Sequence, residues 1–136
     1  QGRERTSLIK TRVNQNFFRA AILSSYNSKC CITGLAIPDF LVASHIIPWS
    51  KNEQERLNPR NGLCLNSIHD RAFDRGFITV TADYTIKVSR YLNDCVDKTA
   101  VQDFFLKHDN LRINLPDRFL PAPEFLAFHA ENIFIK

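Results

Sequence analysis

The sequence predicts an α+β fold: one domain in which short strands alternate with helices. Three observations support this prediction. Residues 7–26 carry apolar side chains at helical spacing. Two short apolar stretches, 41–47 and 62–65, come before a capped helical stretch that ends near Arg75. Apolar and polar residues then alternate over 77–81 and 84–89, which is typical of a β-hairpin.

Length and composition place the chain among globular domains. Its 136 residues are 44% hydrophobic and 24% charged, which argues against disorder. Apolar runs stay well short of the 18 or so residues that a membrane-spanning helix needs, so we expect no membrane partner. Methionine is absent and the first residues read like a linker. We therefore expect 1–136 to be a single domain from the C-terminal part of a longer protein.

The first predicted element is an amphipathic helix from Ser7 to Tyr26. Val13, Phe17 and Ala21, followed by Ile22 or Ser25, recur at helical spacing and predict the face that meets the core; Phe18 broadens this face. Positive charge is concentrated here, because the only acid up to Pro38 is Glu4 against six Arg and Lys residues. This favours a polyanionic partner, although a solvated charged helix explains the charge equally well.

The bounds of the central elements are predicted by residues that typically start or end strands and helices. Pro38 and Pro48 bound the first strand, and the second begins at Gly62. Asn66 or Ser67 caps the following helix, and Gly76 is placed to end it. After the hairpin we expect a helix over 99–108 and a last helix over 123–132, in which His129 packs between helices.

The four cysteines do not form a recognisable framework. Cys30 and Cys31 are adjacent, Cys64 and Cys95 stand alone, and no C-x-x-C pair exists. We expect free thiols in a cytoplasmic protein rather than disulfides or a structural zinc site.

Residues suited to hydrolysis gather between Ala43 and Gly76. His45 ends the first predicted strand, Asn61 precedes the second, and His69 opens the helix. A histidine near its usual pKa of about 6.5 accepts a proton at neutral pH. A neutral asparagine can orient that ring or pin a loop without competing for the proton.

Four motifs occur in order: Cys30-x-x-Thr33-Gly34, Ser44-His45-Ile46-x-Pro48-Trp49, Asn58-Pro59-x-Asn61-Gly62-Leu63 and His69-Asp70-x-x-Phe73-Asp74-x-Gly76. Together they resemble the HNH endonucleases, and more narrowly the branch found in bacterial restriction-type and anti-phage defence nucleases. The resemblance implies a ββα-metal finger at about 41–76, flanked by helices and the hairpin.

The resemblance also implies roles. His45 would be the general base, Asn61 its catalytic partner and His69 a metal ligand. Asp70 would be the second ligand, with Asp74 as the alternative to it. The cation would be Mg²⁺ or Mn²⁺, with Zn²⁺ and Ni²⁺ as alternatives. Many HNH enzymes carry Asp or His immediately before the base, where this sequence has Ser44. A neutral hydroxyl is a poor substitute, because hard cations prefer carboxylate oxygens.

DNA is the implied partner and phosphodiester hydrolysis the implied reaction. The basic residues expected to contact DNA phosphates flank the finger: Lys51, Arg60, Arg71 and Arg75. The resemblance further implies an effector of a defence protein, joined in its parent chain to a sensing or recognition domain and pairing as a homodimer for double-strand cuts. The alternative is a non-catalytic DNA-binding module that retains the finger.

Overall fold

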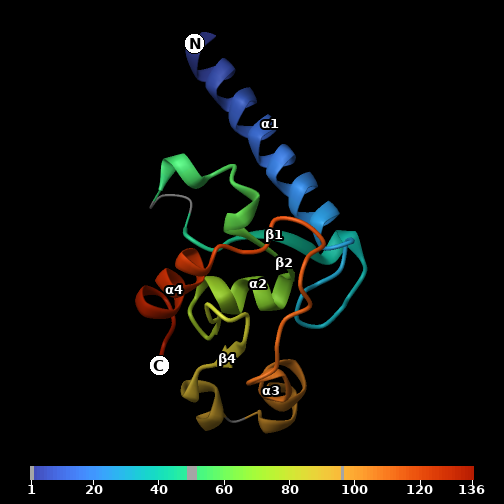
Figure 1. Ribbon diagram of the computed structural model, residues 1–136, viewed down its shortest axis with the longest axis vertical. Helices are drawn as coiled ribbons and strands as arrows, with labels where there is room; N and C mark the ends of the chain where they lie inside the picture. The colour runs from blue at the N-terminus through green and yellow to red at the C-terminus, as the bar shows by residue number, and fades with distance from the viewer. Residues whose placement is uncertain (1, 49–51, 96) are drawn as a thin grey trace.

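The computed structural model describes residues 2–48, 52–95 and 97–136. It confirms the α+β class (Figure 1). The helices and strands, which short 3-10 turns connect, are α1 (Gly2–Ser25), β1 (Leu41–His45), β2 (Gly62–Asn66), α2 (Ser67–Asp74), β3 (Ile78–Val80), β4 (Ile86–Val88), α3 (Lys98–Phe104) and α4 (Pro123–Asn132). None of the helices among these residues is both long and apolar enough to cross a membrane.

The finger consists of β1, β2 and α2. The two strands are antiparallel, and their register pairs Leu41 with Asn66 and His45 with Gly62. Asn66 ends β2 and caps α2, because its side-chain oxygen accepts from the backbone N–H groups of Ile68 and His69 at 3.0 Å each. The chain therefore turns from strand to helix without a loop, and this fixes where the first turn of α2 begins.

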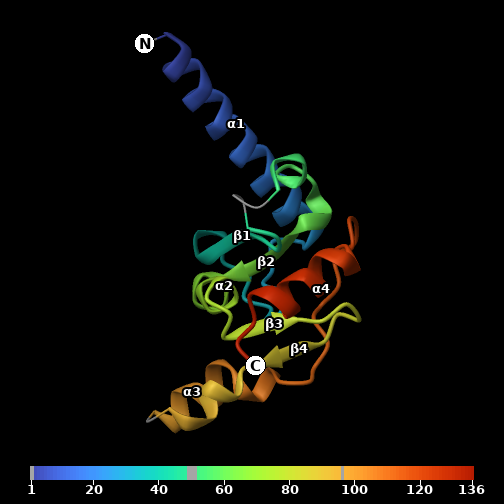
Figure 2. The same ribbon diagram turned by 90° about the vertical axis from the view of Figure 1, so that its left-hand side faces the viewer.

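The buried face of α1 contains only part of the predicted one. Phe18, Ile22 and Ser25 are buried, whereas Val13 and Phe17 are exposed. The reason is where the helix meets β2. At Gly62 an added Cβ would lie 2.8 Å from the Phe18 ring, so the absence of a side chain lets α1 approach on its Phe18 and Ile22 side. Only the last turns of α1 reach the body, and the rest projects from it (Figures 1 and 2).

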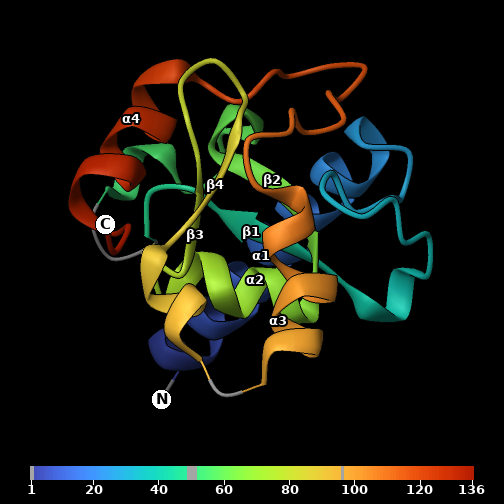
Figure 3. The same ribbon diagram turned by 90° about the horizontal axis from the view of Figure 1, so that it is seen from below.

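The second half of the chain completes the core. The predicted hairpin is confirmed as β3 and β4. The helix predicted over 99–108 is interrupted at Phe105, where φ is −127° and ψ is −60°, and continues as a 3-10 turn over Leu106–His108. The last helix, α4, has the predicted bounds and lies beside β3 (Figure 3). His129 packs from α4 against Phe73 of α2, as predicted, with the rings stacked at 3.7 Å.

Candidate active site

His45, the last residue of β1, is held on two sides. Its ring stacks on Phe18 of α1, with a centroid separation of 4.0 Å and an angle of 5° between the planes. Its Nε2 lies 3.0 Å from the Arg56 carbonyl oxygen. A carbonyl can only accept, so Nε2 carries the hydrogen and Nδ1 carries the lone pair in the neutral ring. Burial lowers the pKa of His45, against a smaller opposing effect of the Arg56 carbonyl. The imidazole is therefore neutral at pH 7.

Asn61 pins the loop that supplies this carbonyl. Its Oδ1 accepts from the Ile47 N–H at 2.8 Å, and its Nδ2 donates to the carbonyls of Ile47 and Glu55 at 3.4 and 3.3 Å. Glu55 is the neighbour of Arg56. The buried amide thus ties together both ends of the segment that follows His45, and it acts on the imidazole through the Arg56 carbonyl.

A pocket of about 430 Å³ opens between β1 and α2, lined by Val42, Ala43, Ser44, His45, Pro48, Asp70 and Asp74. The two carboxylates stand four residues apart and therefore share one face of α2. Asp70 is half-buried, whereas Asp74 lies at the open side. The pocket thus combines a neutral imidazole and two carboxylates from neighbouring elements.

The carboxylates repel one another. Partial burial and, next, the charge of Asp70 raise the pKa of Asp74 to about 6, and burial raises the pKa of Asp70. Ser44 is only 2% exposed. Its Oγ has no hydrogen-bond partner in good geometry among the described residues, although it lies close enough to Asp70 to lower that pKa. Two crowded carboxylates beside an unsatisfied hydroxyl form an oxygen-rich position that a cation would stabilise.

His69, the predicted metal ligand, lies away from this pocket. Its Nε2 donates to the Phe104 carbonyl at 2.6 Å, and its Nδ1 accepts from the Asn66 amide at 2.9 Å. The ring is 2% exposed and packs at 5.2 Å from Phe105. Both nitrogens are engaged by protein groups, so His69 joins α2 to the end of α3 in this structure. It does not meet His45 or Asp70.

The oxygen donors fit a hard cation. No cluster of three or more His, Cys, Asp or Glu side chains positioned for a metal occurs among the residues described. Mg²⁺ nevertheless needs few protein ligands: it keeps several waters and is commonly held by one or two carboxylates plus substrate phosphates. Asp70 and Asp74 supply that pair, which makes Mg²⁺ or Mn²⁺ a better fit than a site built from imidazole or thiolate.

Three of the predicted DNA contacts, Arg60, Arg71 and Arg75, do not line the pocket. Arg71 on α2 and Arg75 just after it are exposed and close enough to Asp74 to lower its pKa. Arg60 is exposed and donates from Nε to the Leu120 carbonyl at 3.2 Å. Lys51 falls outside the described residues. Arg71 and Arg75 are thus basic side chains that lie near the carboxylate pair.

Sequence reasoning misses two members of the site, Phe18 and the Arg56 carbonyl, and ranks a third, Asp74, below Asp70. The spacing of four residues between Asp70 and Asp74, which places both on one face of a helix, is the sequence signal that favours the pair over either residue alone. Phe18 was read only as part of an apolar helix face. The Arg56 carbonyl had no sequence signal, since any residue there offers the same backbone oxygen.

Comparison with known proteins agrees with this geometry. Residues 30–81, which contain β1, β2 and α2, match the family model described as HNH endonuclease. The match confirms the predicted resemblance to HNH endonucleases over this segment. A search of curated proteins finds no match to the chain.

Proposed function

We propose that this chain, which carries an HNH endonuclease segment over residues 30–81, cuts DNA with His45 as general base and a divalent cation held by Asp70 and Asp74. The observation that carries the proposal is the pocket in which these three side chains meet. A base and a charge-stabilising cation are the two requirements of phosphodiester hydrolysis.

His45 suits the role of base through its tautomer. With the hydrogen on Nε2 donated to Arg56, the lone pair lies on Nδ1. A water oxygen attacks phosphorus while its proton passes to Nδ1, and the bond from phosphorus to the leaving oxygen breaks. The Arg56 carbonyl stabilises the imidazolium that forms, and solvent protonates the leaving oxygen. Asn61 acts on the reaction indirectly, because it fixes the loop that carries the Arg56 carbonyl.

The metal role predicted for His69 passes in this proposal to Asp74. Asp70 and Asp74 would hold Mg²⁺ or Mn²⁺, and the Ser44 hydroxyl would complete the oxygen donors. When bound, the cation supplies positive charge to the phosphate and the leaving oxygen. The mutual repulsion of the carboxylates provides part of the driving force for its binding, since it disappears on neutralisation.

DNA reaches this pocket from the side of α2. In this proposal Arg71 and Arg75 contact phosphates next to the scissile bond, and Lys51 and Arg60 are further phosphate contacts. Such contacts give affinity without choosing a sequence. From the motif resemblance we also propose an effector role in restriction or anti-phage defence, with a sensing domain in the parent chain and pairing of copies for double-strand cuts.

A non-catalytic DNA-binding module is the competing proposal. The specific observation in its favour is Ser44, a neutral residue beside His45 where a charged ligand would strengthen the site. In this alternative Asp70 and Asp74 are surface acids, and the protein binds DNA without cutting it.

Cleavage of supercoiled plasmid separates the two proposals. The protein is incubated with Mg²⁺, Mn²⁺ or EDTA beside His45→Ala and a matched control, His108→Ala, whose ring lies outside the pocket. Nicking that requires metal, disappears in His45→Ala and persists in His108→Ala establishes the nuclease. Tight plasmid binding with no cutting under any metal establishes the binding module.

A further inference from the structure

Most of α1 does not contribute buried side chains to the core. None of residues 2–17 is buried, and the buried residues of the helix, Phe18, Ile22 and Ser25, all lie at its C-terminal end. These sixteen residues, the free half of α1, extend for about 24 Å at 1.5 Å per residue. An isolated helix of that length is marginal in water, so a partner would stabilise it.

The free half is basic and its charges are unpaired. Arg3, Arg5, Lys10 and Arg12 make no hydrogen bond or ion pair with any residue that the structure describes, and Glu4 is the one acid in α1. Arg5 and Arg12 are seven residues apart, two helical turns, and therefore project on the same side. Arg19 continues this row and fixes its direction, since it donates to the Leu41 and Pro38 carbonyls at the start of β1.

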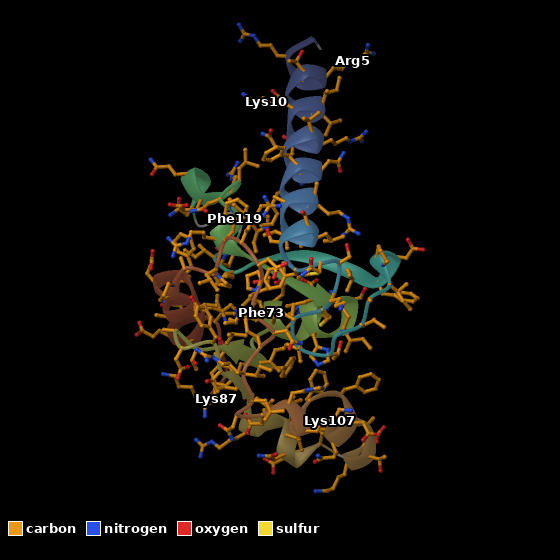
Figure 4. The ribbon with its side chains drawn as sticks, turned by 45° about the vertical axis from the view of Figure 1, so that its right-hand side comes forward. Arg5, Lys10, Phe73, Lys87, Lys107 and Phe119 are labelled. Carbon is orange, nitrogen blue, oxygen red and sulfur yellow. The ribbon has the colours of Figure 1, made fainter. Side chains whose placement is uncertain are left out.

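The free half begins at the pocket. Phe18, the first buried residue of α1, stacks on His45. From there the helix leans outward on the side of the body that carries β1 and α2, away from α4 (Figures 2 and 3). Arg5 and Lys10 reach into solvent from it, and Lys107 marks the opposite end of the molecule (Figure 4).

We propose that the free half of α1 is a second nucleic-acid contact, which binds the sugar–phosphate backbone of the duplex beyond the bond being cut. This inference rests on the proposed function, because the duplex must first occupy the pocket. At 3.4 Å per base-pair step, 24 Å corresponds to about seven steps of duplex. The Arg5–Arg12 row is the phosphate-binding edge.

A second copy of the chain fits this helix less well. Ile9, Val13 and Phe17 are between 59% and 66% exposed and form an apolar stripe along α1. In a helix pair joined through that stripe, the arginine row would flank the seam on one side and Arg3 with Lys10 on the other. Like charges would then face each other with only Glu4 to compensate, whereas a polyanion complements both rows.

The salt dependence of binding tests the proposal. The double variant Arg5→Gln/Arg12→Gln is compared with Lys98→Gln/Lys107→Gln, which removes the same charge from exposed positions on and just after α3. Both are made in the His45→Ala background so that a 30-base-pair duplex stays intact. Fluorescence anisotropy then gives the affinity between 50 and 200 mM salt.

Losing two phosphate contacts lowers the slope of log K against log salt by about 1.8, so the affinity change across this range shrinks about tenfold in the Arg5/Arg12 variant. The Lys98/Lys107 variant keeps the parent slope. Equal slopes in the two double variants, with plasmid cutting by the His45 protein intact, overturn this inference alone. No duplex binding by any protein overturns it together with the proposed function. A concentration-dependent dimer that the Arg5/Arg12 change strengthens would assign α1 to a second copy and also overturn it.

Discussion

The rings of Phe18 and His45 are stacked, with their centroids 4.0 Å apart and an angle of 5° between their planes. Phe18 belongs to α1 and lies outside residues 30–81, the segment that matches the HNH endonucleases. The site therefore depends on a helix that the family match does not include. The stack restricts rotation of the imidazole, while the Arg56 carbonyl sets its tautomer.

Phe18→Leu should slow plasmid cutting by at least tenfold. Leucine fills part of the space but leaves the imidazole without a flat surface, and small displacements of a catalytic group cost large factors in rate. The loss should fall on kcat rather than KM, since Phe18 does not face the pocket. Leu126→Ala, a buried change in α4, is the matched control for stability. An equal loss of cutting in both variants would reduce Phe18 to a structural role.

Asp70→Asn and Asp74→Asn should each weaken Mn²⁺ binding at least tenfold, measured by calorimetry on the metal alone. Without metal, Asp74→Asn should also raise the unfolding midpoint, because it removes the cost of burying this carboxylate and its repulsion from Asp70, which together raise the pKa of Asp74 to about 6. Asp103→Asn, an exposed change on α3, is the control.

His69→Phe distinguishes the two assignments of the metal ligand. It leaves the Phe104 carbonyl and the Asn66 amide without their partner, so it should lower the free energy of unfolding by about 1–3 kcal/mol. Mn²⁺ affinity should stay unchanged. A folded His69→Phe protein that no longer binds Mn²⁺ would return the ligand role to His69.

The pH dependence of cutting should show an acid limb below pH 6.5. Burial lowers the pKa of His45, and the base works only when unprotonated, so kcat/KM rises with pH through that lowered pKa. At saturating Mg²⁺ this limb belongs to His45 alone. At limiting Mg²⁺ a second limb near pH 6 should appear, as Asp74 must lose its proton to bind the cation. In Phe18→Leu, better access of water should move the His45 limb upward. A single limb above pH 6.5 would contradict the assignment of His45.

Local signals in the sequence predicted the finger well, because its elements are set by local chemistry. Pro38 and Pro48 bracket β1, and Asn66 caps α2 through bonds to residues two and three positions on. Contacts of this kind can be predicted from residues that are close in the sequence. The same holds for the Asp70–Asp74 pair, which lies within a single helical turn.

What the sequence could not predict depends on contacts between distant segments. Helical spacing in α1 allows two apolar faces, one through Val13 and Phe17 and one through Phe18 and Ile22. Only the absence of a side chain at Gly62, on another element, decides between them. His69 likewise turns away from the pocket because a carbonyl at Phe104 accepts its proton. The spacing of apolar residues in the sequence does not indicate that Gly62 will contact α1 or that the Phe104 carbonyl will bind His69.

Protonation of His129 should lower the free energy of unfolding at acid pH. Its ring is 2% exposed, with Nε2 donating to the Phe73 carbonyl at 2.8 Å and Nδ1 placed 2.7 Å from the Thr79 hydroxyl. Burial lowers its pKa to about 4, against about 6.5 in the unfolded chain. Between these values the unfolded state binds more protons, so this stabilisation is complete above pH 6.5 and is lost as the pH falls toward 4.

His129→Gln measures that contribution. Glutamine does not titrate, so its unfolding free energy should fall less between pH 7 and pH 4 than that of the unchanged protein, by about 3 kcal/mol for a shift from about 6.5 to about 4. Urea unfolding followed by circular dichroism at several pH values gives both curves. His108→Gln is the control, because the half-exposed ring of His108 loses less of its hydration on folding than the buried ring of His129. If the two curves run parallel, the His129 ring has the same pKa in the folded and the unfolded protein, and the prediction is wrong. The burial of the ring, which stacks on Phe73, is the reason we expect the folded pKa to be the lower one.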